Sequence, residues 1–274
     1  MCCIFCGTLL PEEARFCANC GRQQPQLPQQ RVLEPQLQES LPSLVAWLWH
    51  TRIPETWTLA LETYWQFVKP ENLELEREMD RLDPATVQKL DARGWYDFLL
   101  NKYFRWKYTG ANRLTTTTNT LKKYEGSDTA MAELWAIKER LFEFNKEDIA
   151  EGLKIARSIK GLGPPGASGL LAIMFPRHFG TVDQFVVNAL KEIDMLKETA
   201  LIRKMNPKSL TSRDGLALID ILRSKAQDNN RIFGTDFWTP RKIDMVLWTV
   251  GHKKDNKDNP RLRPLLRRMN FPPQ

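Results

Sequence analysis

All five cysteines of this 274-residue chain lie in its first 20 residues, and this crowding constrains the fold more than any other feature. Cys3 and Cys6 form one CxxC pair, Cys17 and Cys20 form another, and a glycine follows each pair. Two such turns can direct four thiolates at one tetrahedral zinc ion. A segment of about 20 residues buries too little to fold alone, so the metal would supply most of its folding free energy. The spacing predicts a zinc module with Cys2 as a spare thiol.

Two other uses of the cysteines fit the pattern less well. Disulfides suit secreted chains, and no secretory leader is recognisable at Met1. A redox CxxC motif stands beside a strand and a helix, and no such pattern flanks these pairs. Four cysteine ligands leave no open coordination position for water, so we expect the zinc to be structural. With Phe16 before Cys17, the pattern CxxCG(x)nFCxxCG resembles the small zinc-ribbon module. The sequence leaves open whether this module touches DNA or a protein partner.

A stretch rich in Gln and Pro separates the cysteine pairs from the rest of the chain. Its few large apolar groups favour a semi-extended tether. We therefore expect a zinc ribbon at 1–24, a linker at 25–42, a helical body at 43–252 and a basic tail at 253–274.

The body shows helical periodicity from about Ser43 onward and no convincing alternation of the kind that strands show. Asp214 begins a periodic run that Gly234 would end, and Thr239 followed by Pro240 has the cap and first residue of another helix. The prediction is an all-α body of roughly ten helices. Most of the nine tryptophans should pack in its core, because a large aromatic side chain at helical spacing is usually a packing residue.

The composition is that of a globular chain, with 42% hydrophobic and 27% charged residues. The longest apolar run, residues 169–175, is far shorter than the roughly 20 residues that a membrane-spanning helix needs. We expect a monomer without a membrane partner, either cytoplasmic or associated with the nucleoid.

The net charge of +7 is concentrated at the carboxy terminus, where the last 44 residues carry ten basic and four acidic groups. A basic end on a near-neutral body favours a polyanionic partner, and nucleic acid is a commoner one than a membrane. The charge by itself fits a solvated tail without a partner as well as it fits a tail that binds nucleic acid.

A glycine-rich corner joins two helical runs in the middle of the body. Lys160 ends the first run, Gly161, Leu162 and Gly163 follow, and Gly166 lies in the apolar second run. Such a corner presents backbone N–H groups and the positive end of a helix dipole, which bind phosphate without a side chain. Leu162 should point inward and join the two helices. A simple helix–helix corner would have the same glycines.

The segment from Ile159 to Ala167, followed by Val182 and Asp183, resembles the signature of the helix-hairpin-helix DNA glycosylase superfamily. That signature is a hairpin of the form LPGxGxxxA, an apolar helix and a loop that ends in V-D. The resemblance covers the hairpin through Leu190, extends more loosely over 94–251, and does not reach the ribbon or the linker. It implies a hairpin over 148–175 that binds double-stranded DNA through Lys160, Gly161, Leu162, Gly163 and Gly166.

The resemblance also implies that Asp183 faces the sugar of a nucleotide flipped out of the duplex. Breaking the base–sugar bond builds positive charge on the sugar, and a nearby carboxylate stabilises that charge or orients the attacking water. Asp183 also fits the N-cap of a helix that starts at Gln184, because Asp is favoured there. Both roles can hold at once.

Two departures from the family narrow the implied activity. Members that also cut the strand carry a lysine nucleophile two residues after the second hairpin glycine, and here that residue is Pro165, which has no amine. The resemblance therefore implies base excision without lyase activity. Some members bind an iron–sulfur cluster through four carboxy-terminal cysteines, and this chain has no cysteine after Cys20, which excludes that cofactor.

Further candidate DNA contacts lie in two basic stretches. Arg105 and Lys107 alternate with aromatic residues, Arg113 follows them, and this mixture can stack on a base and hold flanking phosphates. An amphipathic helix with solvated cations would look the same. Arg241 and Lys242 lie in the first turn of a predicted helix, which is another phosphate candidate.

The sequence thus leads to a monofunctional DNA glycosylase that hydrolyses the N-glycosidic bond of a modified or damaged base and leaves an abasic site. One variant would act on modified bases of foreign DNA, such as those of phages, as an antiviral defence. The alternative is a DNA-binding adaptor without catalysis, whose zinc ribbon recruits a protein partner. The sequence does not identify the excised base.

Overall fold

The computed structural model describes residues 8, 16–22 and 43–251. The chain divides into two units, Met1–Ser40 and Leu41–Gln274, and each is described by itself. In the second unit every element with described bounds is a helix, which confirms the all-α prediction for the body. No helix in the described part of the chain is long and apolar enough to cross a lipid bilayer.

The described part of the body contains fourteen α-helices, two short 3₁₀ segments and one π-helical turn. The number exceeds the expected ten because several helices have only four to seven residues. Their bounds are α1 Leu44–His50, α2 Pro54–Phe67, η1 Pro70–Asn72, α3 Leu73–Asp80, α4 Pro84–Gln88, α5 Ala92–Phe98, η2 (the π turn) Leu99–Tyr103, α6 Phe104–Lys107, α7 Ala111–Leu121, η3 Lys122–Gly126, α8 Asp128–Glu143, α9 Ile149–Arg157, α10 Pro164–Met174, α11 Gln184–Leu190, α12 Thr199–Lys204, α13 Ser212–Phe233 and α14 Pro240–Val250.

In the first unit, the second cysteine pair forms the tight turn that the sequence predicts. The Gly21 N–H donates to the Cys17 carbonyl at 2.8 Å, and the Cys17 N–H donates to the Arg22 carbonyl at 3.0 Å. Gly21 has φ +68°, a left-handed conformation that glycine adopts without strain. Cys3 and Cys6 lie outside the described residues, so the four-cysteine site remains a prediction.

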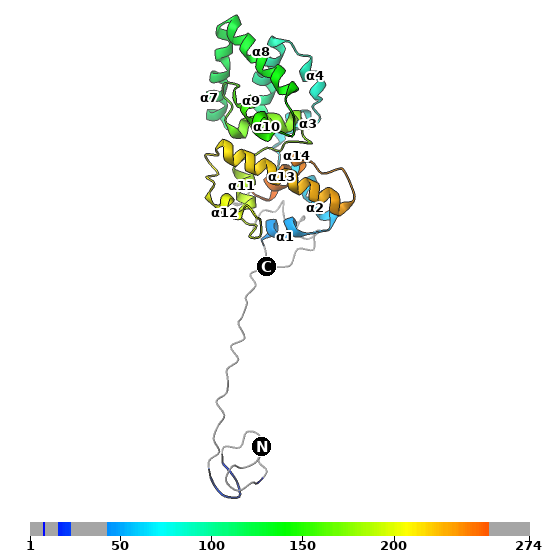
Figure 1. Cartoon of the computed structure of the whole chain (residues 1–274), viewed down its shortest axis with the longest axis vertical. Coiled ribbons are helices and arrows are strands. Elements are labelled where there is room, and N and C mark those ends of the chain that lie inside the picture. The colour runs from blue at the N-terminus through cyan, green and yellow to red at the C-terminus, as the bar shows by residue number, and fades with distance from the viewer. Residues whose placement is uncertain (1–7, 9–15, 23–42, 252–274) are drawn as a thin grey trace. The chain divides into compact units, whose positions relative to one another are not determined.

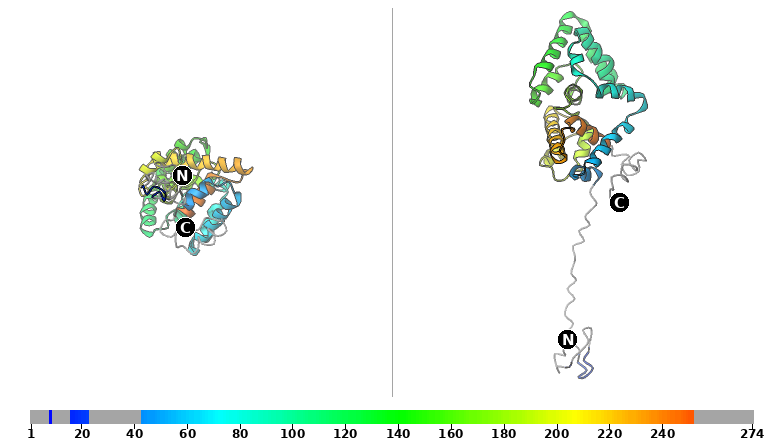
Figure 2. Two further views of the ribbon diagram at one scale, coloured as in Figure 1. Left: turned by 90° about the horizontal axis from the view of Figure 1, so that it is seen from below. Right: turned by 90° about the vertical axis from the view of Figure 1, so that its right-hand side faces the viewer.

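The body consists of two groups of helices (Figure 1). One group holds α3–α9, and the other holds α1, α2 and α11–α14; α10 lies between them and packs on α9, α13 and α14 (Figures 1 and 2). The two ends of the body meet, because α1 and α2 both pack on α14. As expected, early tryptophans are core residues: the Trp57 ring is fully buried, 6.4 Å from the ring of Trp49 and 5.5 Å from that of Trp238.

Helix ends follow the capping signals in the sequence. Thr211 and Asp214 form a reciprocal capping box at the start of α13, so the helix begins at Ser212, slightly before the expected Asp214. Gly234, with φ +63°, ends it as predicted. The Thr239 hydroxyl caps α14, and Pro240 is its first residue.

The corner between α9 and α10 is a helical hairpin with the predicted turn. Leu162 points inward and is 6% exposed. Gly161 has φ +98°, and a Cβ at this position would lie 2.9 Å from the Thr117 carbonyl oxygen on α7. Gly163 has φ −82° and nothing within 4 Å of the place that a Cβ would occupy. Gly161 is therefore required by the fold, whereas Gly163 leaves the hairpin surface open.

We predict that Gly161→Ala lowers the free energy of unfolding by about 1–3 kcal/mol, because alanine is strained at positive φ and its methyl group meets backbone. Gly163→Ala is the matched control and should cost less than about 1 kcal/mol, because its φ is ordinary and the space is free. Urea unfolding of both variants measures the difference. Equal losses would contradict this account of the turn.

Candidate functional site

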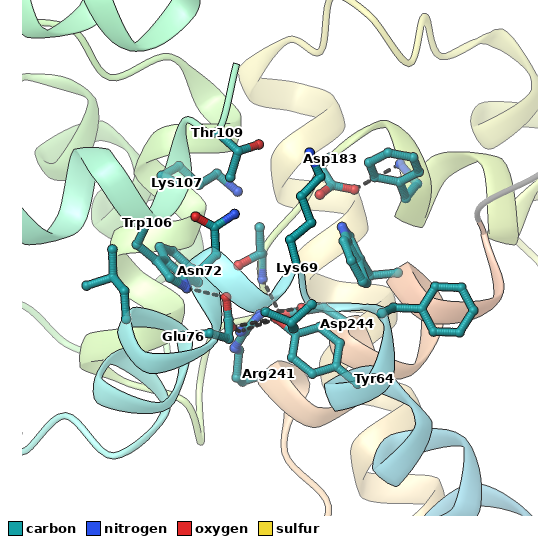
Figure 3. A pocket seen from close by; sticks show the side chains of 16 residues that line it. Tyr64, Lys69, Asn72, Glu76, Trp106, Lys107, Thr109, Asp183, Arg241 and Asp244 are labelled. Atoms are coloured by element: carbon teal, nitrogen blue, oxygen red, sulfur yellow. Dashed lines mark hydrogen bonds and ion pairs between the residues drawn. The ribbon is translucent and has the colours of Figure 1, made fainter. Parts of the chain in front are cut away.

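A pocket of about 350 Å³ lies where the two groups of helices meet. Its walls come from five helices of the body, α2, α3, α6, α11 and α14, and from the segments beside them (Figure 3). A volume of this order is typical of small-molecule sites. The lining residues are Tyr64, Phe67, Val68, Lys69, Asn72, Leu75, Glu76, Trp106, Lys107, Thr109, Thr181, Asp183, Phe185, Arg241, Asp244 and Trp248.

The floor of the pocket is a buried ionic network centred on Arg241. Its guanidinium donates to Glu76 Oε1 at 3.0 Å and to Asp244 Oδ1 at 2.7 Å. The Tyr64 hydroxyl donates to the same Glu76 oxygen at 2.5 Å, and the Trp106 indole N–H donates to Glu76 Oε2 at 2.7 Å. The network thereby joins α2, α3, α6 and α14 under the pocket (Figure 3).

Burial and charge set the protonation of this floor. Burial opposes the charge of Arg241, but Asp244, Tyr64 and Glu76 outweigh burial and raise the pKa of Arg241, so the guanidinium stays charged. Burial raises the pKa of Tyr64 well above its usual value, so the phenol stays neutral and donates. Burial also raises the pKa of Asp244 to about 7, against the opposing effect of Arg241.

Asp183 lies at the start of α11, and its carboxylate is fixed through one oxygen. Oδ1 accepts the Phe185 N–H at 2.9 Å and the Val186 N–H at 3.2 Å, which confirms the predicted N-cap. Within the described residues, Oδ2 accepts no hydrogen bond. The cap thus orients the carboxylate and leaves one oxygen for a ligand in the pocket (Figure 3).

Two more polar side chains line the pocket without a hydrogen-bonding partner in the described part of the chain. Thr181 is only 5% exposed, and its buried hydroxyl is unpaired. Asn72 occupies the N-cap of α3, where Asn is favoured, but its amide does not cap the helix. A buried unpaired hydroxyl costs roughly 1–3 kcal/mol. Unpaired polar groups in the wall of a pocket suit a polar ligand.

Lys107 projects its amine into the same pocket (Figure 3). It ends α6, which follows the π turn at 99–103, where the Phe104 N–H donates to the Leu99 carbonyl. Its stem passes Gly169 of α10, where a Cβ would lie 3.0 Å from Lys107 Cδ. Burial lowers the pKa of Lys107, although Asp183 and Asp244 favour its charged form.

The pocket also has aromatic walls. Trp106, Phe185 and Trp248 line it, and the rings of Phe185 and Trp248 meet edge to face with centroids 5.9 Å apart. Aromatic rings beside hydrogen-bonding groups suit a flat heteroaromatic ligand, because its faces can stack on the rings and its edge can hydrogen-bond to the polar groups.

On the hairpin, the structure places the other predicted residues outside this pocket. Lys160 pairs with Glu133 at 2.9 Å and lies 4.2 Å above the Tyr124 ring. Pro164 and Pro165 are the first two residues of α10 and have no N–H, so the amides left at this helix start are those of Gly163 and Gly166. Gly163 is exposed, whereas Gly166 is buried.

The remaining predicted cations are dispersed. Arg105 is exposed and lines a separate groove of about 360 Å³ with Thr115 and Thr118 of α7, and Arg113 is exposed on the same helix. Lys242 is half-buried; its amine donates to the Phe237 carbonyl at 2.9 Å and lies over the Phe237 ring.

Arg241 requires a correction, because the sequence placed it among phosphate contacts at a helix start. It is 7% exposed, and its guanidinium is engaged by Glu76 and Asp244. The partners on α3 and α14 hold it inside the body, so it supports the pocket floor and does not face the outer surface.

Sequence reasoning missed most of the pocket. It did not identify Asn72, Glu76, Thr181 or Asp244. One signal was present, since Asp244 follows Arg241 by three residues and helical spacing places such a pair on one face. Nothing local links Glu76 to Arg241, which lies 165 residues further along the chain.

A scan against protein-family models and searches of curated proteins and solved structures found no match to this chain.

The raised pKa of Asp244 predicts a pH dependence of stability. An acid whose pKa rises from about 3.9 in the unfolded chain binds its proton more tightly when folded. The stabilisation that protonated Asp244 gives to the folded state is therefore fully present below about pH 4, and it is lost as the pH rises to about 7. Relative to Asp244→Asn, the wild-type free energy of unfolding should fall across this window and level off above it. Urea unfolding across this range measures both profiles, and parallel profiles would contradict the assignment.

Proposed function

We propose that this chain is a DNA glycosylase that accepts a flipped-out nucleotide in the pocket and hydrolyses its base–sugar bond with the help of Asp183. The observation that carries the proposal is the Asp183 carboxylate, oriented through Oδ1 and open at Oδ2 in a pocket with unpaired polar groups. A fixed carboxylate stabilises the positive charge that develops on the sugar during cleavage.

The hairpin resemblance and the pocket support the same activity. The open main chain at Gly163 suits a DNA phosphate, and the exposed Arg105 and Arg113 suit the neighbouring backbone. Trp106 and Trp248 suit stacking on the everted base, while Asn72 and Thr181 suit its polar edge. Because Pro165 offers no amine, we propose water as the nucleophile that releases the base.

The Asp183→Asn variant separates chemistry from folding. Asn caps helices as well as Asp does, so the free energy of unfolding should change by less than about 0.5 kcal/mol. Base release should fall at least about 100-fold, because the amide carries no negative charge. Mass spectrometry of free bases, released from a panel of damaged DNAs and of unmodified and modified phage DNAs, measures the activity.

The same panel tests the rival functions. Release from modified phage DNA alone would favour the defence variant of the proposal. If the wild-type protein bound duplex DNA and released no base from any member of the panel, the non-catalytic adaptor would replace the glycosylase. Undiminished release by Asp183→Asn would remove Asp183 from the mechanism.

We also propose that the first unit binds one structural zinc ion through Cys3, Cys6, Cys17 and Cys20. The half of this set that the structure describes, Cys17 and Cys20, lies in one tight turn that a hydrogen bond from the Gly21 N–H closes. The chemistry of two thiols on one such turn suits zinc. This unit is then a module for contact with DNA or a protein partner.

Metal analysis of the intact protein should find about one zinc ion per chain. Cys20→Ser should lose it, because three thiolates hold the ion far less tightly. Cys2→Ser is the control and should keep a full complement, since Cys2 is outside the two pairs. Wild-type protein without zinc, or loss of zinc in both variants alike, would contradict the four-ligand assignment.

A further inference from the structure

We propose that Lys107 forms an imine with the C1′ aldehyde of an abasic site and then cleaves the strand by β-elimination. This inference rests on the proposed function, because the aldehyde is the product of base release. It replaces the expectation, drawn from Pro165 alone, that the strand stays intact. Pro165 removes an amine from the hairpin, but the pocket contains another that comes from α6.

The position of the Lys107 amine supports this role. It lines the same pocket as Asp183, and Figure 3 shows it directed toward the space beside Asn72 and Thr109. Among the described residues it makes no hydrogen bond or ion pair; the Trp106 ring lies 5.8 Å away. The stem passes over Gly169, where a Cβ would lie 3.0 Å from Lys107 Cδ and 3.1 Å from Cε, closer than ordinary van der Waals contact. The fold thus admits this amine to the pocket and leaves it available.

The surroundings of Lys107 also favour a reactive amine. An ammonium has no lone pair, so only the neutral form attacks a carbonyl. Burial lowers the pKa of Lys107, and the charged Arg241 acts in the same direction. Asp183 and Asp244 oppose the shift without cancelling it. A desolvated lysine beside another cation is a recognised way to obtain an amine nucleophile.

Two other lysines are rivals for this role and are less suited to it. Lys69 also lines the pocket, but it is exposed to solvent and lacks the partial burial of Lys107. Lys160 lies beside the hairpin turn and is held by Glu133 at 2.9 Å. Lys107 alone among the three combines partial burial with a place beside Asp183.

Imine formation and β-elimination need no external oxidant or reductant. The Lys107 nitrogen adds to C1′ of the open-chain sugar, and water leaves to form a protonated imine. A carboxylate, here Asp183 through Oδ2, removes a proton from C2′. The electron pair of that C–H bond forms the C2′–C3′ double bond, and the C3′–O bond breaks with the phosphate as leaving group. Water then hydrolyses the imine, which frees the lysine and an unsaturated aldehyde.

The test uses the full chain and duplex DNA that already contains an abasic site, made beforehand from a uracil-containing strand. Borohydride reduces an imine to a stable amine, so the wild-type protein should become covalently linked to this DNA. Peptide mapping of the adduct should place the link on Lys107. Without borohydride, the abasic strand should be cut, and the yield should rise with pH as more of the amine becomes neutral.

Lys107→Arg keeps the charge and most of the stem, and Lys107→Met keeps the stem alone; neither can form an imine. Both should lose the adduct while unfolding like the wild type. Lys102→Ala, on the same helical segment but outside the pocket, should be trapped as the wild type is. No wild-type adduct, an adduct mapped to Lys69 or Lys160, or a full yield from Lys107→Met would overturn the proposal. Because the abasic DNA is preformed, trapping without any base release would refute the proposed function and leave this inference standing.

Discussion

The buried guanidinium of Arg241 is the interaction on which the rest of the pocket depends. It lies between Glu76 of α3 and Asp244 of α14, so it ties the two groups of helices together at the place where the pocket opens. Removing one partner of a buried ion pair leaves an uncompensated charge and costs about 3–5 kcal/mol. The same contacts fix the Glu76 carboxylate that accepts from Tyr64 and Trp106. The polar groups of the floor are therefore paired with one another, while the Thr181 hydroxyl in the wall has no partner among the described residues.

The pocket is a candidate site because the polar groups of its floor are paired with one another, whereas polar groups in its walls are left for a ligand. Asp183 uses one oxygen to start α11, and among the described residues neither its other oxygen nor the buried hydroxyl of Thr181 has a hydrogen-bonding partner. The Lys107 amine reaches the same space, and its stem packs closely over Gly169 of α10. A carboxylate, an amine and aromatic rings in one partly desolvated space suit chemistry on a sugar whose base is stacked beside it.

Local signals in the sequence were enough for the helices and pointed to two polar residues of the pocket, Asp183 and Lys107. The cap at Thr239, the helix end at Gly234 and the inward Leu162 follow from short-range rules, and the structure confirms them, although α13 begins at Ser212 and not at the expected Asp214. Asp183 was found because its motif is compact. The pocket floor was not found, because Glu76 and Arg241 meet only after α2 packs on α14, and no spacing rule encodes that contact. Arg241 was misassigned for the same reason, since position at a helix start says nothing about burial.

The central claim is that this pocket holds an everted nucleotide with its sugar against Asp183. A crystal structure of Asp183→Asn bound to duplex DNA with a stable abasic analogue at one position tests this most directly. The account predicts that the abasic sugar lies outside the helical stack, in the pocket bordered by Trp106 and Trp248, with a flanking phosphate at the Gly163 main chain. A duplex that binds elsewhere on the chain, or that keeps every nucleotide stacked while the pocket stays empty, would contradict the account.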